Sequence, residues 1–312
     1  MTAPATRIAR PEADIAARAV RMPNLFVIGA SKSGSSALHA YLRHHPDIAM
    51  SREKEPCFFV DRDELRAAWP IMARQPCSHD LRAYLDLWSA AGDAPWRGEG
   101  SVYYSQAPHR SGVPGRVRAA CPEARIVYLV REPVSRAISH FWQRAKEFQE
   151  PLPLDRAVRE NPIYVDTSDY ALQLDAWLAH FDRDRIKVIV SEDLRARRRE
   201  VLADLSDWLG LDPHEYDAAA LRDVHASPPV SRRERFPLVA RMRDSGLWAA
   251  ARRTLPPGAI ARLRKAGTVE IDKAATDETD ARRWLAAELA PRTARFERMM
   301  GGPIAQWHAP PR

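Results

Sequence analysis

The feature that most constrains the fold is a short apolar run that leads through a glycine- and serine-rich loop into a helix. Leu25–Ile28 is continuously apolar, which is typical of a strand buried on both faces. Gly29 and Gly34 stand in the following turn, small residues fill every position between them except Lys32, and helical spacing begins near Leu38. Backbone N–H groups at a helix N-terminus, together with a lysine, form a phosphate site. The alternative is a close turn that binds nothing.

Two further buried strands are predicted by the apolar runs Ile126–Val130 and Ile186–Val190. Amphipathic helical patterns separate these runs, and another follows the last of them. Alternation of strand and helix predicts an α/β fold of three layers, in which a central parallel sheet is flanked by helices. Ligands of such sheets bind at the carboxyl ends of the strands.

The chain is expected to divide into a flexible leader, residues 1–23, and one domain, residues 24–312. Prolines interrupt the pattern over residues 212–280, which predicts an irregular cap of short helices. Helical spacing returns from Arg282 to Met300, and this tail is expected to pack back on the core.

Composition narrows the compartment and the partners. The three cysteines form no CxxC pair, which fits a reducing compartment and no structural zinc, so a cytoplasmic location is expected. No apolar run reaches the length of a membrane span. The formal charge of +7 arises from 48 basic and 41 acidic residues, a modest excess that favours an anionic partner. The run Arg195–Arg199 lacks interleaved aromatics, so no nucleic-acid partner is expected.

The loop departs from the pattern of Mg-nucleotide enzymes. In Walker A loops the lysine follows the second glycine, whereas Lys32 precedes Gly34. The strand Ile126–Val130 ends in Arg131 and not in an acidic residue that could hold magnesium. The loop is therefore P-loop-like, and no metal is expected at the site.

A second phosphate site is predicted where the strand Ile126–Val130 ends. Arg131 follows this strand, and Ser139 lies eight residues later, about two turns along the next helix. A planar guanidinium and a hydroxyl suit a terminal phosphate monoester. The alternative is an arginine paired with the neighbouring Glu132.

Taken together, these motifs resemble the sulfotransferase superfamily that uses 3'-phosphoadenosine-5'-phosphosulfate (PAPS). The chain carries KxGSS in the first loop and RxPxxRxxSxF from Arg131 onward. The segments KEPCFF at 54–59 and GEGSVYY at 98–104, and the tail from Met300 to Trp307, resemble the heparan-sulfate-type and related bacterial members. The resemblance covers roughly residues 24–307.

The resemblance implies roles for individual residues. The first loop would hold the 5'-phosphosulfate, with Lys32 at the bridging oxygen, and Arg131 and Ser139 would hold the 3'-phosphate. Glu55 would be the general base that deprotonates the acceptor. The residues implied in donor binding are Lys32, Ser33, Gly34, Ser35, Ser36, Arg131, Ser139 and Arg233, and those implied in acceptor binding are Lys54 and Cys57.

Some questions stay open at this level. Members of the family often have histidine where this chain has Cys57, so the role of that side chain is in doubt. Arg232 and Arg233 either close over the 3'-phosphate or are solvated loop charges. The expected reaction is sulfuryl transfer to a hydroxyl or amine of a small-molecule or carbohydrate acceptor. The alternatives are a Mg-dependent, kinase-like phosphotransferase and a non-catalytic nucleotide-binding protein. The acceptor and the oligomeric state are not encoded in any recognisable motif.

Overall fold

The computed structural model describes residues 22–147, 150–212, 214–217, 221, 230–234, 268–273 and 275–308. For residues 230–234 and 268–272 the description covers the backbone alone. The predicted leader, apart from its last two residues, and most of the predicted cap therefore lie outside the described residues.

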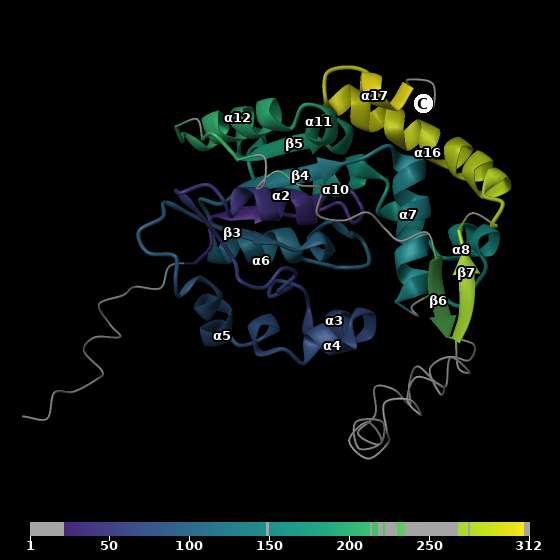
Figure 1. Cartoon of the computed structure of the whole chain (residues 1–312), viewed down its shortest axis with the longest axis horizontal. Helices are drawn as coiled ribbons and strands as arrows, with labels where there is room; N and C mark the ends of the chain where they lie inside the picture. The colour runs from purple at the N-terminus through teal and green to yellow at the C-terminus, as the bar shows by residue number, and fades with distance from the viewer. Residues whose placement is uncertain are drawn as a thin grey trace, which may run out of the picture.

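A five-stranded parallel sheet forms the centre of the molecule, with strand order β2-β3-β1-β4-β5 (Figure 1). In its middle, Leu25 lies opposite Gly98 on one side and Arg125 on the other. The strands are β1 (Leu25–Val27), β2 (Ile48–Met50), β3 (Trp96–Gly100), β4 (Arg125–Val130) and β5 (Ile186–Val190). The three predicted strands are confirmed as β1, β4 and β5.

Helices cover both faces of this sheet. The main α-helices of the layers are α2 (Ser35–Leu42), α6 (Val113–Ala120), α7 (Pro133–Lys146), α8 (Leu154–Glu160), α9 (Ile163–Asp166), α10 (Tyr170–Leu178), α11 (Ser191–Ala196), α12 (Arg198–Leu209) and α16 (Thr279–Met299). The other described α-helices are α3 (Arg62–Ala68), α4 (Pro70–Ala73), α5 (Leu81–Leu85) and α17 (Ala305–His308). The 3₁₀ turns are η1 (Pro76–Ser78), η2 (Asp86–Trp88), η3 (Val102–Ser105) and η4 (Arg183–Arg185).

The alternation of side chains along the strands divides the core between the two faces. On β1, Leu25 and Val27 pack with α2 and α12, whereas Phe26 packs with α6 and α10. A third cluster joins α7, α8 and α9 to the first half of α16. The three-layer α/β architecture expected from the sequence is thus confirmed.

The C-terminal helix α16 returns to the domain, as the spacing of its apolar residues predicts. Leu285 and Leu289 pack in the α7 cluster, and Phe296 packs in the cluster that contains α10. None of the described helices is long and apolar enough to span a membrane.

The described part of the predicted cap contains strands where short helices were expected. Its backbone forms two antiparallel strands, β6 (Val230–Glu234) and β7 (Thr268–Asp272), and β6 lies beside α7 (Figure 1). The remainder of residues 212–280 lies outside the described residues, apart from short pieces at its two ends.

Candidate active site

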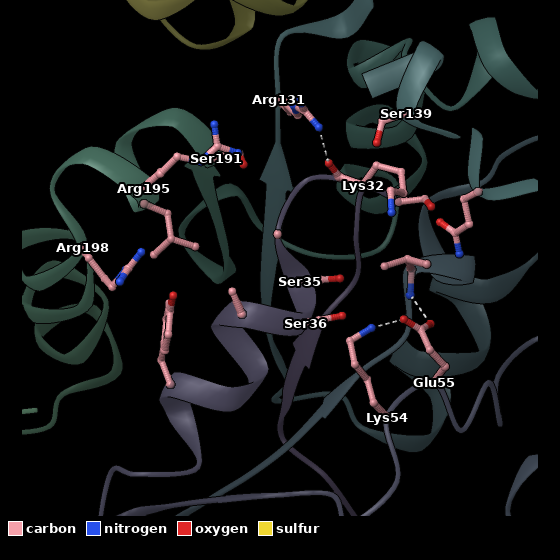
Figure 2. A pocket seen from close by; sticks show the side chains of 17 residues that line it. Lys32, Ser35, Ser36, Lys54, Glu55, Arg131, Ser139, Ser191, Arg195 and Arg198 are labelled. Atoms are coloured by element: carbon pink, nitrogen blue, oxygen red, sulfur yellow. Dashed lines mark hydrogen bonds and ion pairs between the residues drawn. The ribbon is translucent and has the colours of Figure 1, made fainter. Parts of the chain in front are cut away.

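A pocket of about 410 Å³ opens at the carboxyl ends of the parallel strands. Its lining comes from the loop after β1, the segment after β2, and the helices that follow β4 and β5. Figure 2 shows Ser35 and Ser36 at the start of α2, with Lys54 and Glu55 to one side and Arg195 and Arg198 to the other. The crossover connections therefore bring together residues that are far apart in sequence.

Glycines shape the loop between β1 and α2. Gly29 has φ 134°, and a Cβ atom there would lie 2.0 Å from the Ser105 hydroxyl oxygen, so a larger residue would push η3 away. Gly34, with φ 93°, is the N-cap of α2, and no side chain of the described residues caps this helix. The first N–H groups of α2 consequently face the pocket beside Ser35 and Ser36, where they can bind an anion.

Lys32 lies on this loop with a left-handed backbone, φ 70°, which is uncommon for a residue with a side chain. Burial lowers the pKa of Lys32, the carboxylate of Glu147 works against that shift, and the charges of Lys273 and Arg131 add to it. An ammonium group in such a place is partly stripped of water and gains from an anionic ligand.

Arg131 and Ser139 reach the same pocket from the end of β4 and from α7. Arg131 donates to the carbonyl oxygen of Lys32 at 3.3 Å, which ties the two phosphate-binding candidates together. The carboxylate of Glu132 accepts from the N–H groups of Val134 and Ser135 and so caps α7. The Glu132 carboxylate therefore caps the helix, in contrast to the alternative in which it pairs with Arg131. Burial lowers the pKa of Arg131, and the nearby Arg195 adds to that shift.

Glu55 is held at the opposite side of the pocket. Its backbone N–H donates to the Gly100 carbonyl at 2.9 Å, and its side-chain Oε2 accepts from the Val102 N–H at 2.7 Å. The other carboxylate oxygen pairs with Lys54 (Figure 2). The carboxylate is only 14% exposed, yet it lines the pocket and can accept a proton there.

A second carboxyl group, Glu99, lies behind Glu55 at the end of β3 and is fully buried. The Tyr84 hydroxyl donates to it, and burial raises its pKa to about 7, while the hydroxyls of Tyr84, Tyr104 and Ser101 work against the rise. The charge of Glu55 contributes to the rise. Glu99 does not line the pocket, so it acts on the site only through its neighbours.

Arg195 and Arg198 line the pocket but are absent from the residues predicted for the site. Arg195 belongs to α11 and is exposed, whereas Arg198 begins α12 and stacks over Tyr41 at 5.1 Å. The basic run at 195–199 is visible in the sequence, and so is its place after a predicted strand. A basic run that follows a predicted strand indicates arginines at the ligand-binding edge of the sheet.

Two predicted residues do not line the pocket, and a third lies where only the backbone is described. Ser33 is fully buried, and its N–H donates back to the Ala30 carbonyl at 3.1 Å. Cys57 is fully buried with a pKa raised well above its usual value by burial, which matches an inert core thiol. Arg233 lies on β6, and its side chain is outside the described residues. The other predicted residues, Lys32, Gly34, Ser35, Ser36, Lys54, Glu55, Arg131 and Ser139, all line the pocket.

Comparison with known proteins decides the family. The model of the sulfotransferase family matches residues 23–215, more than half of the chain, and this range contains every residue that lines the pocket. The chain belongs to the sulfotransferase family. The resemblance of the sequence motifs to this family is thereby confirmed.

Curated relatives of this sulfotransferase include enzymes named for heparan sulfate. The bifunctional heparan sulfate N-deacetylase/N-sulfotransferase 1 of Caenorhabditis briggsae is 25% identical over 224 residues, which cover 63% of this chain and 23% of that protein. The human heparan sulfate glucosamine 3-O-sulfotransferase 3B1 is 27% identical over 210 residues, 63% of this chain and 49% of the relative. The chain thus spans less than half of the length of each of these relatives.

Among solved structures, a sulfotransferase from Alicyclobacillus acidocaldarius shares the fold. The TM-score is 0.63 at 24% sequence identity, and the match covers 92% of this chain and 99% of that one. This similarity agrees with the fold class seen in the described residues.

Proposed function

We propose that this sulfotransferase moves the sulfuryl group of PAPS to a hydroxyl or amine of a small-molecule or carbohydrate acceptor. The observation that carries the proposal is the meeting of Lys32, Arg131 and Glu55 in one pocket with the open N-terminus of α2. These are the groups that a doubly phosphorylated donor and a proton-releasing acceptor require.

The charges in the pocket support an anionic donor. One carboxylate, Glu55, stands among five cationic side chains in the lining. The five are Lys32, Lys54, Arg131, Arg195 and Arg198. Of these, Lys32 and Arg131 are largely withdrawn from water, so their interaction with a phosphate is stronger than it would be at an open surface.

We assign the donor one orientation in the pocket. The N–H groups at the start of α2, with Ser35 and Ser36, would hold the 5'-phosphate, while Arg131 and Ser139 would hold the 3'-phosphate. Bound PAPS supplies the activated sulfuryl group. Lys32 would stabilise the negative charge that develops on the oxygen bridging sulfur and the 5'-phosphate.

Glu55 would take the proton from the acceptor as the acceptor oxygen or nitrogen bonds to sulfur. Its carboxylate is fixed by Val102 and Lys54, so little reorganisation precedes proton transfer. Lys54 lies where it can also contact a polar acceptor. The relatives named for heparan sulfate support a carbohydrate acceptor within this proposal.

Two alternatives make different demands on the site. A kinase-like phosphotransferase needs acidic ligands for magnesium, and the described residues contain no group of three His, Cys, Asp or Glu side chains placed to hold a metal. A non-catalytic nucleotide-binding protein has no need for a fixed carboxylate, yet Glu55 is fixed at the pocket. Membership in the sulfotransferase family favours neither of these two alternatives.

The test compares the effects of three nucleotides on thermal unfolding. Adenosine 3',5'-bisphosphate should stabilise the protein more than Mg-ATP or Mg-ADP, because only the first has a 3'-phosphate for Arg131 and Ser139. A ligand at about 100 times its Kd adds roughly 2.7 kcal/mol to the free energy of unfolding, which raises the Tm by several degrees.

Arg131→Ala should remove most of this stabilisation, while Arg82→Ala, an exposed arginine on α5, should leave it unchanged. Equal or greater stabilisation by Mg-ATP would overturn the proposed function.

A further inference from the structure

A side pocket of about 30 Å³ adjoins the main pocket. It lies between η3, the residues that follow η3 as far as Arg110, and one face of α7. Ser31, Val102 and Gln143 line both cavities, so the two are contiguous. Val102 is also the residue whose N–H holds the Glu55 carboxylate. The side pocket therefore begins next to the proposed general base.

Arg110 supplies positive charge to this side pocket, and no carboxylate of the described residues forms an ion pair with it. It is half-buried, its guanidinium lies 5.7 Å from the centre of the Tyr103 ring, and one nitrogen donates to the His109 carbonyl. Its buried Nε atom has no hydrogen-bond partner among the described residues, and none of their carboxylates lies within ion-pair distance of it. A half-buried guanidinium in this condition is stabilised by an anion.

The neighbouring charges leave the side pocket net positive. Arg144 also lines it, and its charge and that of Arg110 repel each other. Glu147 brings one negative charge, but its carboxylate is exposed at the end of α7 and accepts from Gln143 at 3.0 Å. His140 is kept uncharged because burial lowers its pKa well below the usual value. Among the residues that line the side pocket, Arg110 and Arg144 are thus cationic and Glu147 is the carboxylate, while the charge of Glu64 also acts on Arg110.

Gln106 gives a second and independent indication of a ligand. Its side chain lines the side pocket, and the residue is only 3% exposed. Its Oε1 atom has no hydrogen-bond partner among the described residues. Buried amide oxygens are nearly always hydrogen-bonded, since an unmatched one costs about 1 to 3 kcal/mol. A hydroxyl or amine donor on a ligand would satisfy it.

The size of the side pocket limits what enters it. A cavity needs about 10 to 15 Å³ to hold one water molecule, so this one holds two or three atoms of that size. A carboxylate fits this space, whereas a sugar or aromatic ring does not. The rest of the acceptor would lie in the main pocket, over Glu55.

We propose that the side pocket binds a carboxylate of the acceptor through Arg110, with an adjacent hydroxyl or amine donating to Gln106. The acceptor is then an acid that carries hydroxyl or amino groups near its carboxylate. This assignment rests on the proposed function, because the rest of the acceptor would lie in the main pocket beside the donor.

The experiment uses matched pairs of probes, each pair a hydroxy acid and the primary amide of the same acid. Binding is measured by saturation-transfer NMR on the protein saturated with adenosine 3',5'-bisphosphate and on the protein alone. Because the readout is binding, it does not depend on turnover. Failure of adenosine 3',5'-bisphosphate to bind would count against the proposed function, while the preference for acids would still be measurable on the free protein.

We expect the protein to bind hydroxy acids about tenfold more tightly than their amides, since a charged hydrogen bond exceeds a neutral one by about 1.4 kcal/mol. Arg110→Gln should abolish the preference, and Gln106→Leu should weaken acid and amide alike. Arg82→Gln is the matched control for the loss of one positive charge. The preference of the unaltered protein is informative even where Arg110→Gln does not fold. Equal binding of acids and amides, or a preference that survives Arg110→Gln in a folded protein, would overturn the proposal.

Discussion

Glu55 combines three constraints that are seldom found on one surface carboxylate. Its backbone is left-handed with φ 62°, its side chain is 14% exposed, and both carboxylate oxygens have partners. A strained backbone of this kind costs on the order of 1 to 3 kcal/mol and persists only where the surroundings enforce it. The hydrogen bond from the Glu55 N–H to the Gly100 carbonyl is one of the enforcing contacts.

Replacing Glu55 by glutamine tests its role as a base. The amide oxygen can still accept from the Val102 N–H, but the side chain no longer accepts a proton. Turnover should fall by about 10² to 10⁴-fold, while binding of adenosine 3',5'-bisphosphate stays nearly intact. Glu53→Gln, which alters an exposed carboxylate two residues away, is the control and should retain turnover. Steady-state kinetics with a true acceptor gives the measurement.

Lys32→Ala should also reduce turnover, but through lost stabilisation of the leaving oxygen, an effect of a few kcal/mol. An acceptor whose nucleophile is already deprotonated at the assay pH should partly rescue Glu55→Gln and leave Lys32→Ala impaired. Turnover of Glu55→Gln within about twofold of the parent would show that another group removes the proton.

Glu99 makes the stability of the fold depend on pH. Its pKa in the folded protein is about 7, against 4.5 for an unperturbed glutamate. The folded state therefore binds this proton more tightly, so the stabilisation is complete below about pH 4.5 and is lost as the pH rises to about 7. The shift corresponds to a free energy on the order of 3 kcal/mol.

Glu99→Gln should remove this dependence, because an amide does not ionise in the range. From pH 5 to pH 8 the free energy of unfolding of the parent should fall relative to that of the variant by up to about 3 kcal/mol. Urea unfolding of both proteins at the two pH values measures the difference. Glu123→Gln, at an exposed carboxylate, should track the parent at both. If the difference in free energy of unfolding between the parent and Glu99→Gln is the same at pH 5 and pH 8, then Glu99 keeps one protonation state over this range.

At the level of elements, the sequence predicts those strands whose residues are apolar throughout. β1, β4 and β5 meet this condition or nearly so, and each is preceded or followed by an amphipathic helix. The strand β3 reads Trp-Arg-Gly-Glu-Gly, with two glycines and a carboxyl group, which is unfavourable for a strand by local propensity. It forms because its neighbours β1 and β2 supply hydrogen bonds on both sides, information that no local pattern contains.

The candidate site was predictable where residue type and position in a loop coincide. Lys32 and Arg131 each follow a predicted strand, and strand ends meet at one edge of a parallel sheet. Arg195 and Arg198 follow β5 in the same way, but their run also suits a solvated helix face, and side-chain direction decides between the two. Ser33 shows the converse, because its position in the loop does not reveal that its side chain turns inward.

At the scale of the molecule, the parallel sheet joins segments that the chain separates by about 160 residues. The loop before α2, the start of α7 and the residues of α11 line one pocket although different strands carry them. A ligand that spans the pocket should stabilise all of these segments together, since each contributes at least one contact. A ligand held by the first loop alone would stabilise only that loop.

Amide hydrogen exchange can distinguish these two outcomes. With adenosine 3',5'-bisphosphate bound, exchange should slow at residues 31–37, at residues 131–139 and at residues 191–198, each by tenfold or more if local opening governs exchange and the ligand exceeds its Kd sufficiently. Helix α8 packs on α7 but does not line the pocket, so its exchange should change little. Arg131→Ala should lose the protection at residues 131–139 while keeping part of that at residues 31–37, because the N–H groups of α2 are unaltered. Protection confined to residues 31–37 in the unaltered protein would mean that the 3'-phosphate does not reach Arg131, and the orientation proposed for the donor would then have to be reversed.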